Sequence, residues 1–214
     1  MRYKAVVFDV DGVLTEIDSI WRFIHEKLGT WNIAKKYAEM FKRGEIDYVK
    51  WAELDVSLWK DIPFHKIIEI IKEVKLRDGG KELIRFLKIK GLKTIAISAG
   101  LDVLTDYVAK ILGIDKAVSN RLIISNNVLT GEVEVKVLYN NKDLVLKNVC
   151  EELGISPTET ISVGDSEVDL PMMLKSGFSI AVNPTSEAVI KVAKRVLYLK
   201  DLRELIPVFN EILY

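Results

Sequence analysis

The spacing of hydrophobic residues changes twice along the chain, and each change predicts a different kind of structure. Residues 2–10 form a short apolar run with the length and bulk of a buried strand. Residues 15–77 carry apolar side chains at helical spacing instead, in four stripes separated by turn-forming residues. The stripes begin at Ile20, Ile33, Tyr48 and Ile67. This pattern predicts a small antiparallel bundle of four helices.

From residue 78 onward, apolar runs of strand length alternate with amphipathic helical segments. Strands are expected at 94–97, 117–118, 160–164 and 178–182, with a hairpin of 122–125 and 128–137. Helices are expected at 80–90, up to 112, at 142–153, from 171, and near 187 and 202. This alternation predicts an α/β fold with a doubly wound, mainly parallel, Rossmann-like sheet. We therefore expect an α/β core of residues 1–14 and 78–214, and a four-helix-bundle cap of residues 15–77 inserted after the first strand.

Two acids, Asp9 and Asp11, stand at the end of the first predicted strand and are followed by Gly12. Ligands of open α/β sheets bind at the carboxyl ends of the strands, and residues two apart on a strand point to the same side. Two carboxylates so close together repel each other and favour a bound cation or a shared proton. Taken alone, the segment also fits a turn that happens to be acidic.

A second strand end carries two further acids. Residues 160–164 predict a buried strand, and Asp165 and Asp169 follow it with a spacing that shares a face if the turn is helical. Four acids at two strand ends indicate a magnesium site, since Mg²⁺ prefers a few hard oxygen ligands and leaves room for water and a phosphate. An N-capping aspartate is the alternative when this second motif is taken alone.

Two more features suit a bound phosphate. The predicted strand 94–97 ends in Ser98 and Ala99, where a hydroxyl and backbone N–H groups are able to hold an anion. Lys142 opens a predicted helix, where a cation opposes the helix macrodipole, so a phosphate-facing role explains it better than a surface role. The alternatives are an ordinary N-cap for Ser98 and a solvated side chain for Lys142, with Lys136 and Lys147 as rival phosphate ligands.

These segments resemble a known family when they are taken together. FDVDGVLT, the Ser98 strand end, Lys142 and GDSEVD are similar, in this order, to the four motifs of the haloacid dehalogenase superfamily. Their spacing resembles the phosphoserine phosphatase branch, which has a helical cap, and the likeness covers nearly the whole chain. The four-motif set is specific for the superfamily and much less specific for the substrate.

The resemblance implies a phosphatase, a phosphoric monoester hydrolase acting on a small phosphorylated metabolite through an aspartyl phosphate. Asp9 would be the nucleophile, and Asp11 would act as acid and then as base. Mg²⁺ would be held by Asp9, by the Asp11 carbonyl and by Asp165, with Asp169 binding directly or through water. The phosphate would be bound by Ser98, Ala99 and Lys142.

Two positions of the predicted cap depart from the phosphoserine phosphatase pattern. Where that branch has a glutamate and an arginine that hold the amino and carboxylate groups of phosphoserine, this chain has Asp18 and Asp55. Asp18 suits an amino group, whereas Asp55 would repel a carboxylate. Phosphoserine is therefore not expected to be the best substrate. A solvated helix face remains the alternative for both residues.

Other functions stay open at this stage. They are phosphoserine hydrolysis proper and a phosphomutase or phosphotransferase that uses the same nucleophile. A dehalogenase has no need of Asp11 or of the magnesium acids, and a non-catalytic regulatory protein has no use for this arrangement.

Composition indicates the partners, the cellular location and the kind of source organism to expect. The 214 residues are 49% hydrophobic, and 31 basic side chains balance 31 acidic ones. This balance argues against nucleic acid or an anionic membrane as a partner. No signal-peptide pattern or membrane-spanning run is present, so a cytoplasmic location is expected. Cys150 is the single cysteine, which predicts a buried thiol and no disulfide. The absence of glutamine and the abundance of Lys, Glu and Ile favour a thermophilic source.

Overall fold

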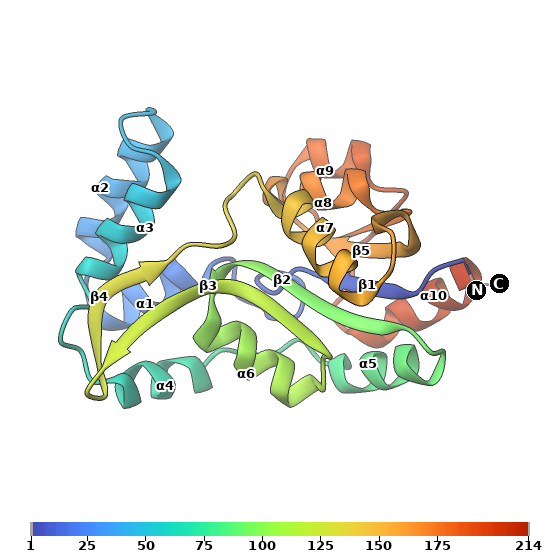
Figure 1. Cartoon of the computed structure of the whole chain (residues 1–214), viewed down its shortest axis with the longest axis horizontal. Helices are drawn as coiled ribbons and strands as arrows, with labels where there is room; N and C mark the ends of the chain where they lie inside the picture. The colour runs from blue at the N-terminus through green and yellow to red at the C-terminus, as the bar shows by residue number, and fades with distance from the viewer. Residues whose placement is uncertain (1, 214) are drawn as a thin grey trace.

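A seven-stranded sheet runs through the computed structural model, which describes residues 2–213 (Figure 1). Neighbouring strands of this sheet pair in parallel, except for the antiparallel pair of β3 and β4. From one edge to the other, the strands are β4 (Val128–Glu134), β3 (Lys116–Ser125), β2 (Lys93–Leu101), β1 (Ala5–Phe8), β5 (Thr160–Gly164), β6 (Phe178–Val182) and β7 (Arg195–Leu197). The predicted α/β class and mainly parallel sheet are confirmed.

Helices connect the strands and form the N-terminal insertion. The first four α-helices are α1 (Ile20–Leu28), α2 (Trp31–Lys42), α3 (Tyr48–Ser57) and α4 (Phe64–Lys72). The others are α5 (Gly80–Ile89), α6 (Asp102–Leu112), α7 (Lys142–Leu153), α8 (Leu170–Lys175), α9 (Glu187–Val192) and α10 (Leu205–Leu213). Short 3-10 turns are η1 (Pro157–Glu159), η2 (Glu167–Asp169) and η3 (Leu202–Glu204).

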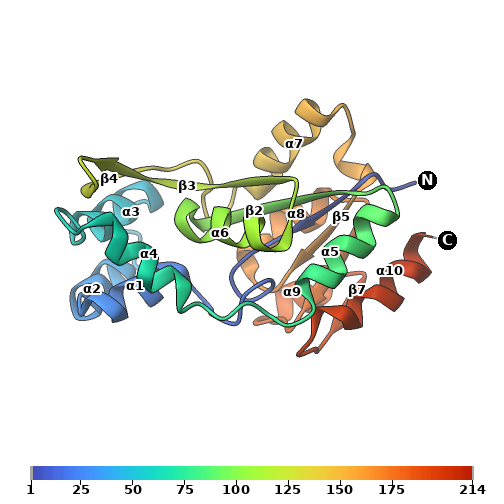
Figure 2. The same cartoon turned by 90° about the horizontal axis from the view of Figure 1, so that it is seen from below.

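Helices cover both faces of the sheet. α5, α6 and α10 lie on one face, and α7 and α8 lie on the other (Figures 1 and 2). Val6 and Phe8 of β1 belong to the larger hydrophobic core. Ala5 and Val7 belong to the second core, which also contains the buried Cys150. Because β1 is buried on both faces, its sequence is a continuous apolar run, and polar residues appear only where the strand ends.

The helices α1–α4, here called the cap helices, lie beyond one end of the sheet and beside the β3–β4 hairpin (Figure 1). The hairpin is bonded to the first residue of α4, because the Phe64 N–H donates to the Asn127 carbonyl at 2.8 Å. The chain that enters the cap helices pairs with the chain that leaves them at Thr15 and Leu76. We propose this pairing as the base of the predicted cap, residues 15–77, whose independence as a domain stays a prediction.

The structure corrects three sequence expectations. Segments 117–118 and 122–125 belong to one strand, β3, rather than to two. The polar residues between these segments include Asn120, which is fully buried and accepts hydrogen bonds from the Lys136 and Val137 N–H groups, both at 2.8 Å. The helix expected near 202 starts as the turn η3 before α10, and strand β7 was not expected.

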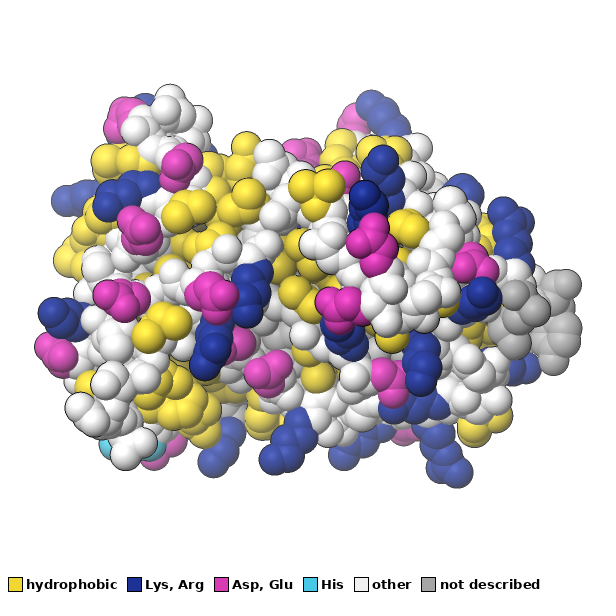
Figure 3. All heavy atoms as spheres, viewed as in Figure 1, with side chains coloured by type: hydrophobic (Ala, Val, Ile, Leu, Met, Phe, Trp, Pro, Cys, Tyr) yellow, Lys and Arg dark blue, Asp and Glu magenta, His cyan; other side chains and the backbone are white. Residues whose placement is uncertain are grey.

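Charges are dispersed over the molecule. On the face shown in Figure 3, acidic and basic side chains are interspersed rather than separated into large fields of one sign. Among residues 2–213, no helix combines the length and the apolar composition that crossing a membrane requires.

Candidate active site

Asp9 and Asp11 lie on the loop that follows β1, at the carboxyl edge of the sheet. Asp9 is 6% exposed, and its N–H donates to the Val163 carbonyl of β5 at 2.9 Å. Gly12 has a φ of +77°, and a Cβ there would lie 2.4 Å from Oδ2 of Asp165. A glycine is therefore required for the two strand ends to come this close.

Arg77 holds this loop from the far end of the cap helices. Its Nε donates to the Val13 carbonyl at 3.0 Å, and its Nη2 donates to the Gly12 carbonyl at 2.7 Å. Arg77 was not predicted as a site residue, because nothing in its local pattern distinguishes it from a surface arginine. Its contacts identify it as a positioning residue for the loop that carries Asp9 and Asp11.

Lys142 occupies the centre of the site. It is 1% exposed, and its Nζ donates to Oδ1 of Asp9 at 2.6 Å and to Oδ1 of Asp169 at 2.7 Å. Burial alone would lower the pKa of Lys142, but Asp169 and Asp9 raise it above its usual value. The lysine therefore stays charged, and its position at the first residue of α7 is compensated by two carboxylates.

The rival lysines lie elsewhere. Lys136 is exposed and pairs with Glu134 at 3.3 Å, and Lys147 is exposed and pairs with Glu151 at 3.7 Å. The interpretation of Lys142 as a solvated side chain is wrong.

The GDSEVD motif folds back on itself as the turn η2. Oδ2 of Asp169 accepts hydrogen bonds from the Asp165 N–H at 2.9 Å and from the Ser166 N–H at 3.1 Å. A Cβ on Gly164 would lie 2.6 Å from the Cβ of Asp169, so this position also requires glycine. Asp169 is fully buried, and its other oxygen receives Lys142.

Asp9, Asp165 and Asp169 form a carboxylate cluster in which ligand oxygens of all three lie within 4.8 Å of one another. Burial, followed by the neighbouring Asp169, raises the pKa of Asp9 to about 7. Burial, followed by Asp9, raises the pKa of Asp165 to about 8. Lys142 supplies one positive charge against three acids. An oxygen-only set of buried carboxylates with an excess of negative charge fits a hard divalent cation.

Asp11 belongs to the same edge but has a different environment. Its Oδ2 accepts a hydrogen bond from the Ile20 N–H at 2.8 Å, at the start of α1. Its Oδ1 is buried and has no hydrogen-bond partner among the described residues 2–213. Burial raises the pKa of Asp11 to about 6.

Ser98 and Ala99 lie where β2 approaches the cap helices. Ser98 is buried, and its Oγ accepts a hydrogen bond from the Gly100 N–H at 2.9 Å. Helix α6 begins at Asp102, so Ser98 is not its N-cap. The Ala99 carbonyl accepts hydrogen bonds from Nε1 of Trp21 at 3.0 Å, the Tyr48 hydroxyl at 3.0 Å and Nδ2 of Asn120 at 2.9 Å. The phosphate contacts of Ser98 and Ala99 stay predictions.

The two unusual cap acids lie in different places. Asp18 is exposed and close enough to Asp11 to contribute to its raised pKa. Asp55 is 3% exposed on α3, and its Oδ1 lies 3.5 Å from Nε2 of His25. Asp55 is therefore not on a solvated helix face. His25 was not predicted as a site residue, because it has no metal-ligand spacing along the chain.

Comparison with known proteins agrees with this geometry. The family model of the haloacid dehalogenase-like hydrolases matches residues 3–177. The phosphoserine phosphatase of Methanocaldococcus jannaschii is 32% identical over 205 residues, covering 95% of this chain and 96% of that protein. The phosphoserine phosphatase of Campylobacter jejuni subsp. doylei is 30% identical over 206 residues, covering 96% and 99%.

Solved structures give the same result. A phospho-aspartyl intermediate analogue of phosphoserine phosphatase has a TM-score of 0.81 at 31% identity, covering 97% of this chain and 99% of the other. A substrate-bound phosphoserine phosphatase complex has a TM-score of 0.82 at 30% identity, covering 96% and 98%. The chain belongs to the haloacid dehalogenase-like hydrolases, in the phosphoserine phosphatase branch, as its four motifs predict.

Proposed function

We propose that this protein is a magnesium-dependent phosphomonoesterase that hydrolyses a small phosphorylated metabolite through an aspartyl phosphate on Asp9. The position of Asp9 carries the proposal: it lies at the end of the central strand β1, bonded to Lys142 and beside two other buried carboxylates. The family and its phosphoserine phosphatase relatives, one captured as a phospho-aspartyl intermediate analogue, support the same chemistry.

In the first step, a carboxylate oxygen of Asp9 attacks phosphorus, and the bond between phosphorus and the ester oxygen breaks. Asp11 transfers its proton to the leaving oxygen. Asp11 suits this role because the Ile20 N–H fixes one of its oxygens and the other has no partner within residues 2–213. A pKa raised to about 6 by burial lets Asp11 hold a proton more readily than an exposed aspartate does.

In the second step, Asp11 removes a proton from a water molecule, whose oxygen attacks phosphorus. The bond between phosphorus and Asp9 breaks, so inorganic phosphate leaves and both aspartates return to their starting state. The cap helices cover this edge of the sheet, and Trp21 and Tyr48 bond to the Ala99 carbonyl beside it. They are therefore placed to limit the access of bulk water.

Asp9, Asp165 and the main-chain carbonyl of Asp11 are the proposed ligands of Mg²⁺, with Asp169 binding directly or through water. A bound magnesium ion offsets the repulsion between an anionic nucleophile and a dianionic phosphate. Lys142, Ser98 and the Ala99 N–H are the proposed partners of the phosphate oxygens, where charge accumulates during transfer.

The test is a screen of phosphorylated metabolites with and without Mg²⁺, ranked by kcat/KM. Borohydride reduction of the reacting enzyme converts an aspartyl phosphate to homoserine, and peptide mass spectrometry is expected to find it at position 9. Absence of homoserine at position 9 during confirmed turnover would contradict the proposal. Isomerisation that depends on a sugar bisphosphate, without release of phosphate, would identify a phosphomutase instead.

The wider setting of the enzyme is also part of this proposal. We expect a cytoplasmic enzyme from a thermophile, with a small phosphorylated metabolite as its partner and no nucleic acid or membrane. The equal numbers of acidic and basic side chains and their mixed distribution in Figure 3 support that expectation.

A further inference from the structure

A cavity of about 220 Å³ lies among the cap helices α1, α2 and α3. Its walls include four aromatic side chains, those of Trp21, Trp31, Tyr48 and Trp51. Asp55 and His25 also line it and are almost completely buried. Three polar atoms here lack a hydrogen-bond partner within residues 2–213: Oδ1 of Asp55, Nε2 of His25 and Nε1 of Trp51. Two of these atoms, Oδ1 of Asp55 and Nε2 of His25, lie 3.5 Å apart, so the buried polar groups of the cavity gather around Asp55.

Among residues 2–213, Asp55 forms no ion pair with a lysine or an arginine. Its nearest candidate is His25, at 3.5 Å. Nδ1 of His25 accepts a hydrogen bond from Nε1 of Trp59 at 3.1 Å, and an indole N–H is always a donor. Nδ1 of His25 also lies 2.7 Å from the Thr30 hydroxyl, so this side of the ring has two polar neighbours and Nε2 is the atom that faces Asp55. A buried carboxylate without a counter-ion costs free energy until a cation binds or the group takes up a proton.

The aromatic walls favour a cation in the same place. A positive group over the face of an aromatic ring is attracted by the ring quadrupole, and such cages bind ammonium groups. The guanidinium carbon of Arg22 already lies 5.2 Å from the centroid of the Trp31 ring. Arg22 and Lys42 are exposed where they line the cavity, and Arg22 also pairs with Glu26 at 2.7 Å. The charged side chain buried in the cavity is Asp55.

The cavity is next to the proposed acid of the reaction. Ser19 and Trp21, which line it, flank Ile20, whose N–H donates to Asp11. Trp21 and Tyr48 also donate to the Ala99 carbonyl, one residue beyond Ser98. A leaving group protonated by Asp11 therefore departs beside this cavity.

We propose that the cavity binds an ammonium group on the leaving alcohol, so that the substrate is the phosphate ester of a short amino alcohol without a carboxylate. This inference rests on the proposed function. Asp55 is the counter-ion of the ammonium group, and Trp21, Trp31, Tyr48 and Trp51 surround it. A carboxylate on the same leaving group would face Asp55 and be repelled.

The first test compares substrates that differ only in charge. Ethanolamine phosphate is paired with propyl phosphate, and choline phosphate with 3,3-dimethylbutyl phosphate. For at least one pair, kcat/KM is expected to be about tenfold or more higher for the ammonium ester, and higher than for phosphoserine. Equal values within both pairs, or a preference for phosphoserine, would overturn the inference.

The second test measures binding without catalysis. All four tryptophans lie within residues 21–59, and three of them line the cavity, so tryptophan fluorescence reports its occupancy. Choline and ethanolamine are titrated against their uncharged counterparts, 3,3-dimethylbutanol and propanol. The ammonium compounds are expected to bind about tenfold more tightly, and this ratio is expected to fall toward one in Asp55→Asn.

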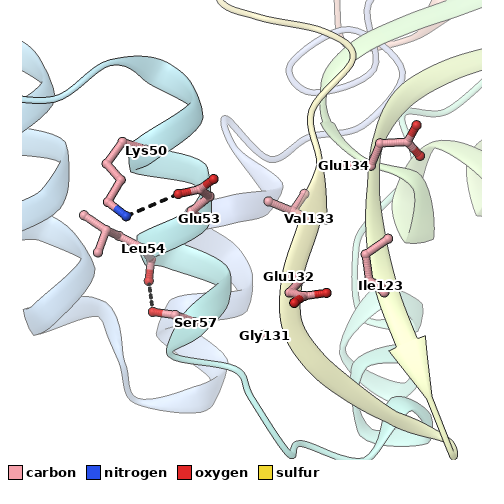
Figure 4. A pocket seen from close by; sticks show the side chains of 9 residues that line it. All are labelled: Lys50, Glu53, Leu54, Ser57, Ile123, Gly131, Glu132, Val133 and Glu134. Carbon is pink, nitrogen blue, oxygen red and sulfur yellow. Dashed lines mark hydrogen bonds and ion pairs between the residues drawn. The ribbon is translucent and has the colours of Figure 1, made fainter.

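Glu53→Gln is the matched control. Glu53 is on the same helix and loses the same charge, but it is exposed and pairs with Lys50 at 3.3 Å. It lines a different groove, between α3 and the β3–β4 hairpin, which Figure 4 shows. In Glu53→Gln, the affinity for the ammonium compound divided by the affinity for its uncharged counterpart is expected to stay at the wild-type value. An equal fall in both variants would indicate a general charge effect and overturn the assignment of Asp55.

The two proposals fail in different ways. If no ester is hydrolysed, p-nitrophenyl phosphate included, the proposed function fails, and the fluorescence ratio still decides the ligand of the cavity. If p-nitrophenyl phosphate is hydrolysed but neither pair shows a charge preference, only the inference about the cavity fails.

Discussion

The carboxylate cluster and the cap cavity both contain buried carboxylates, but the surroundings of these carboxylates differ. In the cluster, Lys142 bonds to two of the acids, and Asp169 also accepts two backbone N–H groups. In the cavity, Oδ1 of Asp55 has no hydrogen-bond partner within residues 2–213. A network bonded internally is held in place before a substrate arrives, whereas an unmatched group obtains its partner from the ligand. In our proposals, the reaction takes place at the carboxylate cluster and the cavity selects the substrate.

The largest effect is expected from breaking the cluster at its nucleophile. Asp9→Asn is expected to lower kcat by at least about 1,000-fold, because an amide is a poor nucleophile and a poorer metal ligand. Steady-state kinetics on the best substrate of the screen measure this loss. Activity within tenfold of the wild type, with deamidation excluded by mass spectrometry, would remove Asp9 from its proposed role.

The same variant tests whether the cluster is crowded with negative charge. Without metal, the melting temperature of Asp9→Asn is expected to equal or exceed that of the wild type, since one of three close carboxylates has become neutral. Thermal unfolding in EDTA measures this, and it also shows that any loss of activity is not a loss of folding.

The next effect concerns the metal. Activity is expected to vanish in excess EDTA and to return with Mg²⁺, and Asp165→Ala is expected to raise the Mg²⁺ requirement by at least roughly tenfold. Mg²⁺ titrations of kcat, with elemental analysis of the purified protein, measure both. Full activity in EDTA with no metal bound would contradict the assignment.

A smaller effect is expected from changing the charge of the cavity. Asp55→Arg is expected to raise kcat/KM for phosphoserine about tenfold relative to the wild type, because it supplies a cation for the carboxylate. Glu53→Arg is the control on the opposite side of α3, with melting temperatures measured for both variants. If the wild type already prefers phosphoserine tenfold, a cation other than residue 55 must bind the carboxylate of phosphoserine. Arg43 and Lys50 would then be the candidates; both are exposed, and they pair with Glu45 and Glu53.

The smallest effect is expected where the two regions meet. Tyr48→Phe removes one hydrogen bond to the Ala99 carbonyl and is expected to cost about 1 kcal/mol of stability, or roughly 2–4 °C in melting temperature. Tyr107→Phe on α6 is the control, because the structure gives its hydroxyl no hydrogen bond within residues 2–213. Equal melting temperatures for the two variants would show that the Tyr48 bond is not stabilising.

A sequence pattern predicts an element well when the side chains of that element only pack in the hydrophobic core. The helix at 142–153 and the strands at 160–164 and 178–182 have the predicted bounds, because their apolar residues serve only the core. Strand β3 was divided in the prediction because Asn120 is polar for a reason outside the strand, namely its bonds to residues 136 and 137. No local pattern contains that information.

The candidate site likewise contains residues that the sequence pattern predicts and contacts that it does not predict. The acids at 9, 11, 165 and 169 were predicted to lie together because strand ends converge on one edge of a parallel sheet, and the structure brings the carboxylates of 9, 165 and 169 within 4.8 Å of one another. The direct contact of Lys142 with Asp9 spans 133 positions of sequence, and periodicity cannot reveal it. Asp55 and His25 belong to different helices, so their meeting depends on how α1 packs against α3.

The Ala99 carbonyl also joins the cap helices to the sheet. Its three donors come from α1, α3 and β3, yet a carbonyl oxygen has only two lone pairs, so the donors compete. Lifting the cap helices breaks the bonds from Trp21 and Tyr48 and leaves Asn120 in place. At about 1 kcal/mol or less for each bond, the closed form is favoured by no more than about thirtyfold through this latch. These two bonds are therefore a weak latch, and most of the attachment of the cap helices comes from the hydrophobic core that Ile20 and Ile24 share with β1.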